Sequence, residues 1–536
     1  MSTKSRAGFQ TLLVYFVMFF SARSPSPEAA RILAIPTDWS HWIIMKSLLL
    51  ELVQRGHEVT VLRGSSSLRI EATNEDFTME NIRTSEEQAH AFLTEDKVDD
   101  FIFNVYYVED GFLSSFSAAL TLIAVSDVNF GVTFPFIQGL FEDRALMDRL
   151  KAGGFDVVLA DPFHAAGAML SHVLDTPLVF FGRWMLSGDI HFNLASSPLS
   201  FVPMLHSRLS DRMSLVGRLK NVLVYGMSKL INHFYTYPAY NRLCQLYLND
   251  EITVEELYRK ADIVLMKVDF VFEYPRPTMP NLIYIGGIQC GPGRPLPADL
   301  QRFMDNSGED GVVIFSLGSI VGTIPPEAAS EVAAGLARLP QRVIWRYIGA
   351  LSPNLGNNTK ILSWFPQNDL LSHPKTRALI THGGENGLYE AIYHGVPVVG
   401  IPIFFDQYDN LLRLKTRGAA VMLDLAHIKS DDIFHAVKTV IENPSYAENM
   451  KRLSALYRDV PVRPMELAAF WIEYTIRHRG APHFRAAGND LPFCQYHLLD
   501  VFTIIVVFMG FFFYLVFKLL NVLLVKLCSG SKRKRD

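Results

Sequence analysis

The sequence predicts an α/β fold made of two doubly wound domains in series, and three observations support that prediction. The 536-residue chain is longer than one hydrophobic core usually supports, and it is 49% hydrophobic against 19% charged. Short β-rich apolar runs alternate with helical periodicity in two separate series. Proline and glycine crowd into CGPGRPLPADL (290–300), between the two series. We therefore expect a first domain over residues 31–288 and a second over residues 289–480.

The first series begins with a strand, a helix and a second strand, an order that predicts parallel pairing. RILAIP (31–36) and EVTVLR (58–63) are the strands, and residues 40–55 between them have helical spacing. Residues 105–150 and 195–250 are helical, aromatic and apolar, and we expect them to form the walls of a substrate pocket. The other strand candidates of this domain are residues 156–160, 177–181 and 281–287.

The second series repeats the alternation of apolar runs and helical segments, so a second parallel sheet with helices on both faces is expected. Ligands of such sheets bind outside the carboxyl ends of the strands, and with two domains the site is expected in the cleft between them. The strand candidates are 311–316, 342–346, 377–381 and 396–402, and the helix candidates are 326–338, 385–394, 406–417 and 431–442.

The N-terminus has the pattern of a secretory signal peptide. Lys4 and Arg6 precede the apolar run TLLVYFVMFFS (11–21), which is too short to cross a bilayer and is followed by small and turn-forming residues. A buried core helix is the structural alternative. We expect residues 1–30 to be a signal peptide, cleaved either after residue 22 or nearer residue 30.

The C-terminus has the pattern of a membrane anchor. Residues 498–517 form a 20-residue apolar run in which only Asp500 is charged, enough for one transmembrane helix. The tail 518–536 is basic, which predicts a cytosolic location for it and a lumenal location for both domains. The final KRKRD resembles the dilysine signal that returns type I proteins to the endoplasmic reticulum, although a basic stop-transfer flank would have the same composition. The sequence therefore predicts a single-pass protein of the endoplasmic reticulum membrane.

Composition argues against several other classes. A net charge of −4 and a pI near 6.5 give no bulk attraction to nucleic acid. Four cysteines, two of them flanking the predicted membrane helix on opposite sides, do not form a disulfide framework, and no Cys/His spacing predicts a metal site. Asn357 begins the one N-x-S/T sequon without proline and is the predicted glycosylation site.

The stretch THGGENGLYE (381–390) has the pattern of an anion site at a helix start. Glycines let a phosphate approach the backbone closely, and the first free N–H groups of a helix attract negative charge. Around Gly384, His382 is placed to donate to a phosphate oxygen. Asn386 and Glu390 lie on one face of the helix, where Glu390 is placed to accept hydrogen bonds from ribose hydroxyls.

Two further motifs flank this stretch. In WFPQNDLL, Trp364 could stack on a pyrimidine while Gln367 hydrogen-bonds its edge, and the alternative for Trp364 is an ordinary core residue. Asp406 and Gln407 follow the strand VPVVGIP at its carboxyl end, where a carboxylate and an amide suit sugar hydroxyls.

The first domain offers a base and an orienting acid. Transfer to an alcohol requires removal of a proton, and a positioned histidine is the usual base. His41 lies in TDWSHW at the turn after the first strand, and Asp161 follows the apolar run DVVLA. Adjacent parallel strands would bring the two side chains within hydrogen-bonding range, with Asp161 orienting the imidazole; Asp161 could instead cap the following helix.

The segment from Trp364 to Gln407 resembles the signature of the UDP-glycosyltransferases, and most closely that of the vertebrate UDP-glucuronosyltransferases. SHW (40–42), ADPF (160–163) and FSLGS (315–319) extend the resemblance over nearly the whole chain. It implies two Rossmann-like domains in the GT-B arrangement, with the acceptor in the N-terminal domain and the UDP-sugar in the C-terminal one. It also implies His41 as base and Asp161 as its partner. The implied donor contacts are Ser319, Trp364, Gln367, His382, Gly384, Asn386, Glu390, Asp406 and Gln407.

The activity that this resemblance implies is inverting transfer of glucuronic acid from UDP-glucuronate to hydroxyl groups of small lipophilic acceptors. The UDP-sugar is a co-substrate, no cofactor or metal is required, and association with a like or related chain is expected. Glu385 and Phe405 depart from the pattern: a small or hydroxyl residue is usual at the first position, and Ala or Gly at the second. A UDP-hexosyltransferase using glucose, galactose or N-acetylglucosamine donors is the alternative enzyme, and a catalytically silent membrane-anchored binding protein is the alternative from another class.

Overall fold

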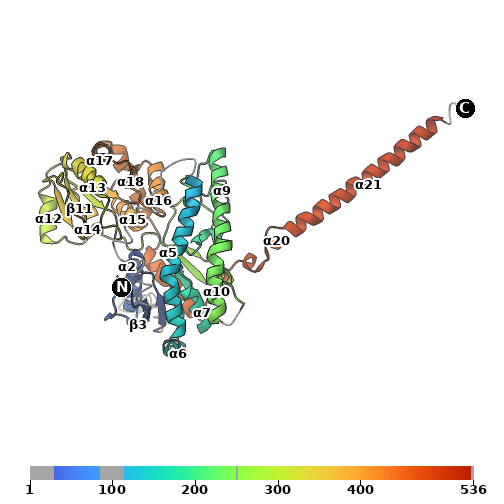
Figure 1. The fold of residues 1–536 in the computed structure, drawn as a ribbon, viewed down its shortest axis with the longest axis horizontal. Helices are drawn as coiled ribbons and strands as arrows, with labels where there is room; N and C mark the ends of the chain where they lie inside the picture. The colour runs from blue at the N-terminus through green and yellow to red at the C-terminus, as the bar shows by residue number, and fades with distance from the viewer. Residues whose placement is uncertain (1–28, 85–113, 249–250, 533–536) are drawn as a thin grey trace, which may run out of the picture. The chain divides into compact units, whose positions relative to one another are not determined.

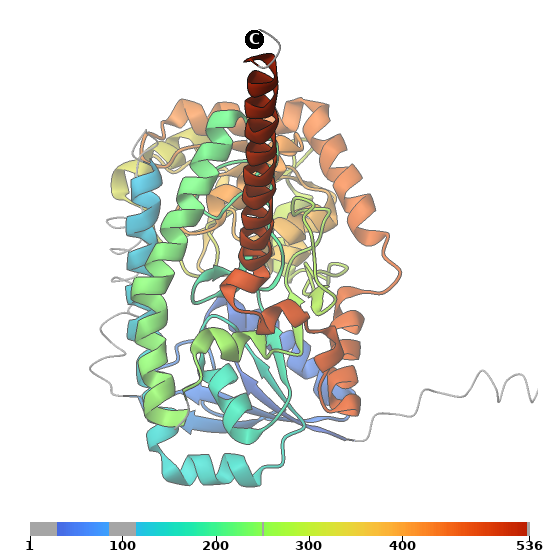
Figure 2. The same ribbon diagram turned by 90° about the vertical axis from the view of Figure 1, so that its right-hand side faces the viewer.

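The computed structural model describes residues 29–84, 114–248 and 251–532. These fall into two compact units, Met1–Pro482 and His483–Asp536. The first unit contains both predicted sheets, each wholly parallel in its pairing, and its elements are shown in Figures 1 and 2. Residues 1–28 of the predicted signal peptide lie outside the described residues.

The first sheet has seven strands in the order β3-β2-β1-β4-β5-β8-β9. Its central strands are short, apolar and buried along their whole length, as expected where helices cover both faces. The helix α2 (Ser40–Gln54) joins β1 to β2. The strands are β1 (Arg31–Ile35), β2 (Glu58–Gly64), β3 (Thr78–Ile82), β4 (Val157–Ala160), β5 (Leu178–Phe181), β8 (Ile263–Met266) and β9 (Leu282–Tyr284).

The second sheet has six strands in the order β12-β11-β10-β13-β14-β15. As the sequence predicts, strands alternate with helices along this domain, and the buried strands and the buried faces of the helices form its core. The strands are β10 (Val312–Ser316), β11 (Arg342–Arg346), β12 (Thr359–Leu362), β13 (Thr376–Thr381), β14 (Val398–Gly400) and β15 (Ala420–Met422). The helices that connect them include α13 (Pro326–Ala337), α14 (Gln367–Leu371), α15 (Glu385–His394), α16 (Gln407–Thr416) and α17 (Ser430–Glu442).

The two-domain α/β prediction is confirmed, and several details differ from the sequence prediction. The strands β3, β8, β12 and β15 were not predicted, and β9 and β14 are shorter than the apolar runs that contain them. Residues 195–214 are not a helix, because Pro198 and Pro203 interrupt that segment. The predicted helical regions otherwise appear as α5 (Ser114–Glu142), α6 (Arg144–Ala152), α9 (Leu215–Ile231) and α10 (Tyr237–Leu248), while residues 105–113 and 249–250 lie outside the described part.

Helices far apart in sequence complete the first domain. The long helices α5 and α9 lie side by side in Figures 1 and 2. The helix α19 (Pro464–His478) follows the second sheet in sequence but packs against α2, β4 and β8 of the first sheet. Ala481, just after α19, donates its N–H to Asp262 at 2.8 Å. The C-terminal end of the first unit is therefore anchored on the first domain.

The second unit contains one long apolar helix, α21 (Leu499–Lys532). Its segment Leu499–Lys526 has 28 residues and contains an 18-residue window with a mean hydropathy of 2.4, and it is the one helix of the described chain long and apolar enough to cross a membrane. Residues 499–517 of the predicted apolar run therefore lie within a longer helix, and Leu498 lies just before its start.

Candidate active site

A cavity of about 1130 Å³ opens where the carboxyl ends of the two sheets face each other. This volume exceeds that of a typical single-ligand pocket, so it has room for a nucleotide sugar together with a second molecule. Asp161 lies directly behind its wall. All the other predicted site residues line it: His41, Ser319, Trp364, Gln367, His382, Gly384, Asn386, Glu390, Asp406 and Gln407.

Strand pairing brings His41 and Asp161 together. Ile35 at the end of β1 is paired with Ala160 at the end of β4, and the N–H of Asp161 donates to the carbonyl of Ile35 at 2.9 Å. His41 sits in the first turn of α2, and its Nδ1 lies 2.6 Å from Oδ2 of Asp161. The N–H of Phe163 occupies the other carboxylate oxygen at 2.9 Å. The predicted pair is thus present, although 120 residues separate its members.

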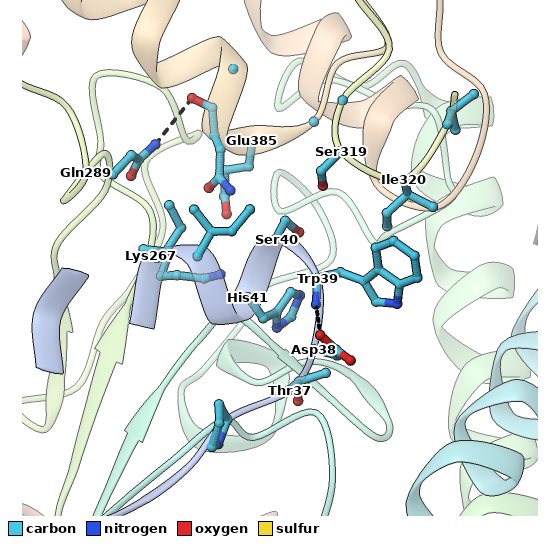
Figure 3. Close-up of a pocket in the computed structure, with 18 of the residues that line it drawn as sticks. Thr37, Asp38, Trp39, Ser40, His41, Lys267, Gln289, Ser319, Ile320 and Glu385 are labelled. Atoms are coloured by element: carbon cyan, nitrogen blue, oxygen red, sulfur yellow. Dashed lines mark hydrogen bonds between the residues drawn. The ribbon is translucent and has the colours of Figure 1, made fainter. Parts of the chain in front are cut away.

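The pair has the chemistry of an oriented general base. Asp161 is 1% exposed. Burial would raise the pKa of its carboxyl, but the charge and hydrogen bond of His41 outweigh burial and lower that pKa. An ionised Asp161 accepts the proton of Nδ1, which leaves the lone pair of Nε2 available to remove a proton. The ring itself lines the cavity (Figure 3).

The loop before α2 is fixed by Asp38. Its carboxylate accepts hydrogen bonds from the N–H groups of Trp39, Leu68 and Arg69 at 2.6 to 3.0 Å. Trp39 has φ 63°, a left-handed conformation that costs free energy for a residue with a side chain. Asp38 therefore holds a strained turn immediately before His41, and the turn sets the direction in which the helix presents the imidazole (Figure 3).

On the opposite side of the cavity, α15 begins after Gly384 without any side-chain cap. Its first backbone N–H groups are therefore available to an anion. His382 precedes this helix start, and burial, with a smaller effect of Arg346, lowers the pKa of its imidazole to about 4. At neutral pH the ring is uncharged, and its N–H donates without adding a full charge.

Two glycines make room for His382. A side chain at Gly318 or at Gly384 would place its Cβ 2.6 Å from imidazole atoms of His382. Gly384 has φ −61° and ψ 137°, so alanine would fit the backbone there and only the ring would have to move. Gly384 thus serves the histidine as well as the approach of an anion.

We expect Gly384→Ala to raise the donor KM about tenfold with little change in thermal stability, because the new methyl group displaces the imidazole from its place beside the helix start. Initial rates over a range of donor concentrations test this. Gly226→Ala is the matched control, since a Cβ at Gly226 meets no atom within 4 Å. An unchanged donor KM in Gly384→Ala would show that His382 does not contact the donor.

Trp364, Gln367 and Glu390 lie on one side of the α15 start. Trp364 is 58% exposed, which contradicts the alternative that it is an ordinary core residue, and its ring lines the cavity. Gln367 donates from Nε2 to Oε2 of Glu390 at 2.7 Å, so these two predicted donor contacts are linked. Burial raises the pKa of Glu390 to about 7, against the opposing effect of this hydrogen bond.

Asp406 and Gln407 follow β14 and differ in what they can still bind. Oε1 of Gln407 accepts from the N–H groups of Ile403 and Phe404 at 2.8 and 3.0 Å, so this oxygen stabilises the loop. Asp406 accepts one hydrogen bond from Asn410 at 2.8 Å. Burial raises the pKa of Asp406, while Arg183 acts in the opposite direction. Asp406 retains acceptor capacity toward the cavity, whereas Gln407 retains only its amide N–H groups.

Ser319 and Asn386 are the remaining predicted donor contacts, and Gln289 is an additional residue on the donor side of the cavity. Ser319 lies in the loop after β10, where Arg346 donates to the carbonyls of Gly318 and Val321 at 2.6 and 3.0 Å. The backbone carbonyl of Asn386 accepts from Nε2 of Gln289 at 3.3 Å (Figure 3). Gln289 belongs to the segment between the two sheets, and the sequence analysis did not assign it.

Lys267 is a cavity residue that sequence reasoning missed. It follows β8, is 8% exposed, and points into the space between His41 and Glu385 in Figure 3. Within the described part of the chain its ammonium has no hydrogen bond or ion pair, and it lies 5.9 Å from the centroid of the Phe181 ring. The available signal was the run DIVLMK (262–267), a basic residue directly after a buried strand, but β8 itself was not predicted.

Among the described residues, no group of three or more His, Cys, Asp or Glu side chains could hold a metal ion. Cys244, Cys290 and Cys494 are free thiols. The site therefore consists of a histidine–aspartate pair on one sheet, an open helix start on the other, and an ammonium between them.

This arrangement defines a class of fold. Solved structures of the GT-B glycosyltransferases have the same architecture. CalG4, the calicheamicin glycosyltransferase, matches with a TM-score of 0.54 and 19% identity, covering 84% of this chain and 98% of its own. VinC, solved in complex with DTDP, matches with a TM-score of 0.56 and 15% identity, covering 84% and 100%. The two Rossmann-like domains are thus in the GT-B arrangement.

The chain belongs to the family described as UDP-glucoronosyl and UDP-glucosyl transferase, whose model matches residues 30–534. It is a UDP-glycosyltransferase. It is 38% identical to human UDP-glucuronosyltransferase 2B17 over 534 residues, with 98% of this chain and 99% of the relative covered. It is 42% identical to rat UDP-glucuronosyltransferase 1A3 over 485 residues, with 89% and 88% covered.

Proposed function

We propose that this protein transfers glucuronic acid from UDP-glucuronate to a hydroxyl group of a small lipophilic acceptor, with inversion at the anomeric carbon. The observation that carries this proposal is the pairing of His41 with Asp161 across one cavity from the uncapped start of α15. The names of the relatives, which are UDP-glucuronosyltransferases, support the choice of donor.

The donor binds on the second domain. Its diphosphate rests on the first N–H groups of α15 and accepts a hydrogen bond from His382. The uracil stacks on the exposed ring of Trp364 and the ribose hydroxyls donate to Glu390, which Gln367 holds in place. Sugar hydroxyls reach Asp406. UDP is the leaving group, and the proposed reaction uses the UDP-sugar as a co-substrate without a cofactor.

Lys267 binds the carboxylate of the glucuronate. An unpaired ammonium in a nearly buried cavity is an attractive site for an anion, because charge pairs gain strength where water is excluded. Its place between His41 and the α15 start is where the sugar must lie if the acceptor is held by one and the diphosphate by the other (Figure 3). Two acidic side chains also line this part of the cavity, Glu385 and Asp406, and both belong to the second domain.

Replacing Lys267 by methionine is expected to lower kcat/KM for UDP-glucuronate about 100-fold while changing kcat/KM for UDP-glucose less than about threefold, because only the first donor has a carboxylate to lose its partner. Donor competition assays with one phenolic acceptor measure both values. Lys438→Met on the exposed face of α17 is the control. Equal losses for both donors would contradict the assignment.

The acceptor binds on the first domain, beside His41. Phe136, Phe163, Val132 and Ile44 line this end of the cavity and favour an apolar molecule. As the acceptor oxygen attacks the anomeric carbon from the face opposite UDP, Nε2 of His41 takes its proton and Asp161 stabilises the imidazolium. The C–O bond to the diphosphate breaks as the new bond forms, which gives a β-linked product from the α-linked donor.

For the cellular setting we infer a signal peptide within residues 1–30, anchoring by α21, and a lumenal location of both domains in the endoplasmic reticulum. The basic residues after the apolar span support the orientation. Asn357 is exposed in the loop before β12, where a glycan would meet no packed surface. Protection of the chain, apart from its short basic tail, from protease in intact microsomes, lost on adding detergent, tests the orientation.

UDP-glucose is the second candidate donor, and Glu385 is the observation that favours it. Its carboxylate lies in the same cavity as Lys267 and lowers the net positive charge that a glucuronate would meet.

A further inference from the structure

Glu385 is a buried carboxylate held against the first domain. It is the first residue of α15, and its side chain is 10% exposed. Nη1 of Arg183, which follows β5, donates to its Oε1 at 3.3 Å. The same guanidinium also binds Glu273 and lies 3.6 Å from Asp189. The acidic side chain is therefore turned across the cleft, away from the backbone N–H groups at the helix start.

Phe405, the second departure from the resembled pattern, contacts Trp184, the residue that follows Arg183 in the first domain. Its ring packs edge-on against Trp184 with centroids 5.0 Å apart, and the guanidinium of Arg183 lies 4.6 Å above the Trp184 ring. Phe405 has φ 55°, a conformation that is costly for a residue with a side chain. Two consecutive residues of the first domain, Arg183 and Trp184, thus accommodate both departures.

The aromatic pair changes how strongly nearby charges interact. Trp184 and Phe405 line the cavity beside Glu385 and Lys267. Apolar rings exclude water from this side of the sugar site, and electrostatic interactions are stronger where water is excluded. Burial accordingly raises the pKa of Glu385 to about 7, while Arg183 and Lys267 lower it and Asp406 raises it further.

Resting on the donor role of Lys267 proposed above, we propose that Glu385 is a specificity-determining residue, whose negative charge in the same cavity repels the carboxylate of a donor sugar bound at Lys267. A donor with a carboxylate meets a second negative group beside Lys267, whereas a neutral hexose has no charge for that group to repel. Glu385 therefore narrows the preference for UDP-glucuronate over UDP-glucose in this chain.

The test compares the ratio of kcat/KM for UDP-glucuronate to kcat/KM for UDP-glucose in the full-length protein in microsomes, with one phenolic acceptor. Glu385→Gln keeps the size of the side chain, and Glu385→Ala restores a small residue. Both are expected to raise the ratio about tenfold, because one like charge is removed from the carboxylate's surroundings. Glu309→Gln, a fully exposed carboxylate before β10, is the control and should leave the ratio unchanged.

The wild-type protein gives an independent readout through pH. Below pH 7 Glu385 is protonated and the ratio should be high; above pH 7 it is ionised and the ratio should fall. Burial raises the pKa of Glu390 to about 7 as well, but Glu390 is assigned to the ribose that both donors share, so its titration cancels in the ratio. Glu385→Gln should make the ratio independent of pH between about 6 and 8.

A wild-type ratio that does not change with pH, or Glu385 variants with the wild-type ratio, would overturn the role of Glu385. If Lys267→Met still lowers the ratio in that case, the proposed donor site stands and only the role of Glu385 fails. If Lys267→Met leaves the ratio unchanged, both the carboxylate site at Lys267 and the proposed effect of Glu385 on it are wrong.

Discussion

Replacing His41 by glutamine is expected to lower kcat about 10²- to 10⁴-fold, which is the usual contribution of a positioned general base. Glutamine retains a polar side chain near Asp161 but cannot take a proton from the acceptor. The donor KM should stay within about threefold of wild type, because the donor site lies on the other sheet. Initial rates at saturating acceptor measure both constants.

His435→Gln is the matched control for that variant, because His435 is exposed on α17, far in sequence from both halves of the site. It should have wild-type kcat. Retention of most turnover by His41→Gln with hydroxyl acceptors would mean that the acceptor proton leaves by another route.

Asp161→Asn is expected to lower kcat about 10³- to 10⁴-fold with the fold intact. Asparagine keeps the acceptor oxygen that the N–H of Phe163 needs. Its amide N–H group then faces Nδ1 of His41 and donates to it, which moves the ring proton to Nε2, the atom that must be free to accept. The kcat and the melting temperature of the variant, measured side by side, separate the lost base from an unfolded protein.

Asp148→Asn, on the exposed face of α6, is the control for a lost carboxylate. A low kcat in Asp161→Asn together with a large fall in melting temperature would indicate a structural role for Asp161. Near-normal kcat would contradict the orienting role.

The sequence predicted the two sheets and most of the site because those features depend on local patterns. Buried parallel strands give continuous apolar runs, and the ends of such runs mark the carboxyl edge of the sheet where His41 and Asp161 lie. Both residues could be assigned from the sequence because each follows an apolar run, and we expected those two strands to be neighbours. The structure pairs β1 with β4.

The features that were missed depend on contacts between distant segments. β8 is only four residues long and was not recognised as a strand, so Lys267, which follows it directly, was missed as well. The partners of Glu385 and Phe405 lie more than 200 residues away. The amide of Gln407 was assigned to sugar hydroxyls, but in the structure its Oε1 accepts from its own loop, a local contact that the motif did not reveal.

The stereochemistry of the product tests the central claim of direct displacement across the cleft most directly. The product formed by the purified protein from UDP-glucuronate and a phenol can be examined by proton NMR before any hydrolysis. Attack from the side of His41, opposite the diphosphate on α15, predicts a β-glucuronide alone. An α-linked product would contradict the placement of base and donor on opposite faces of the sugar.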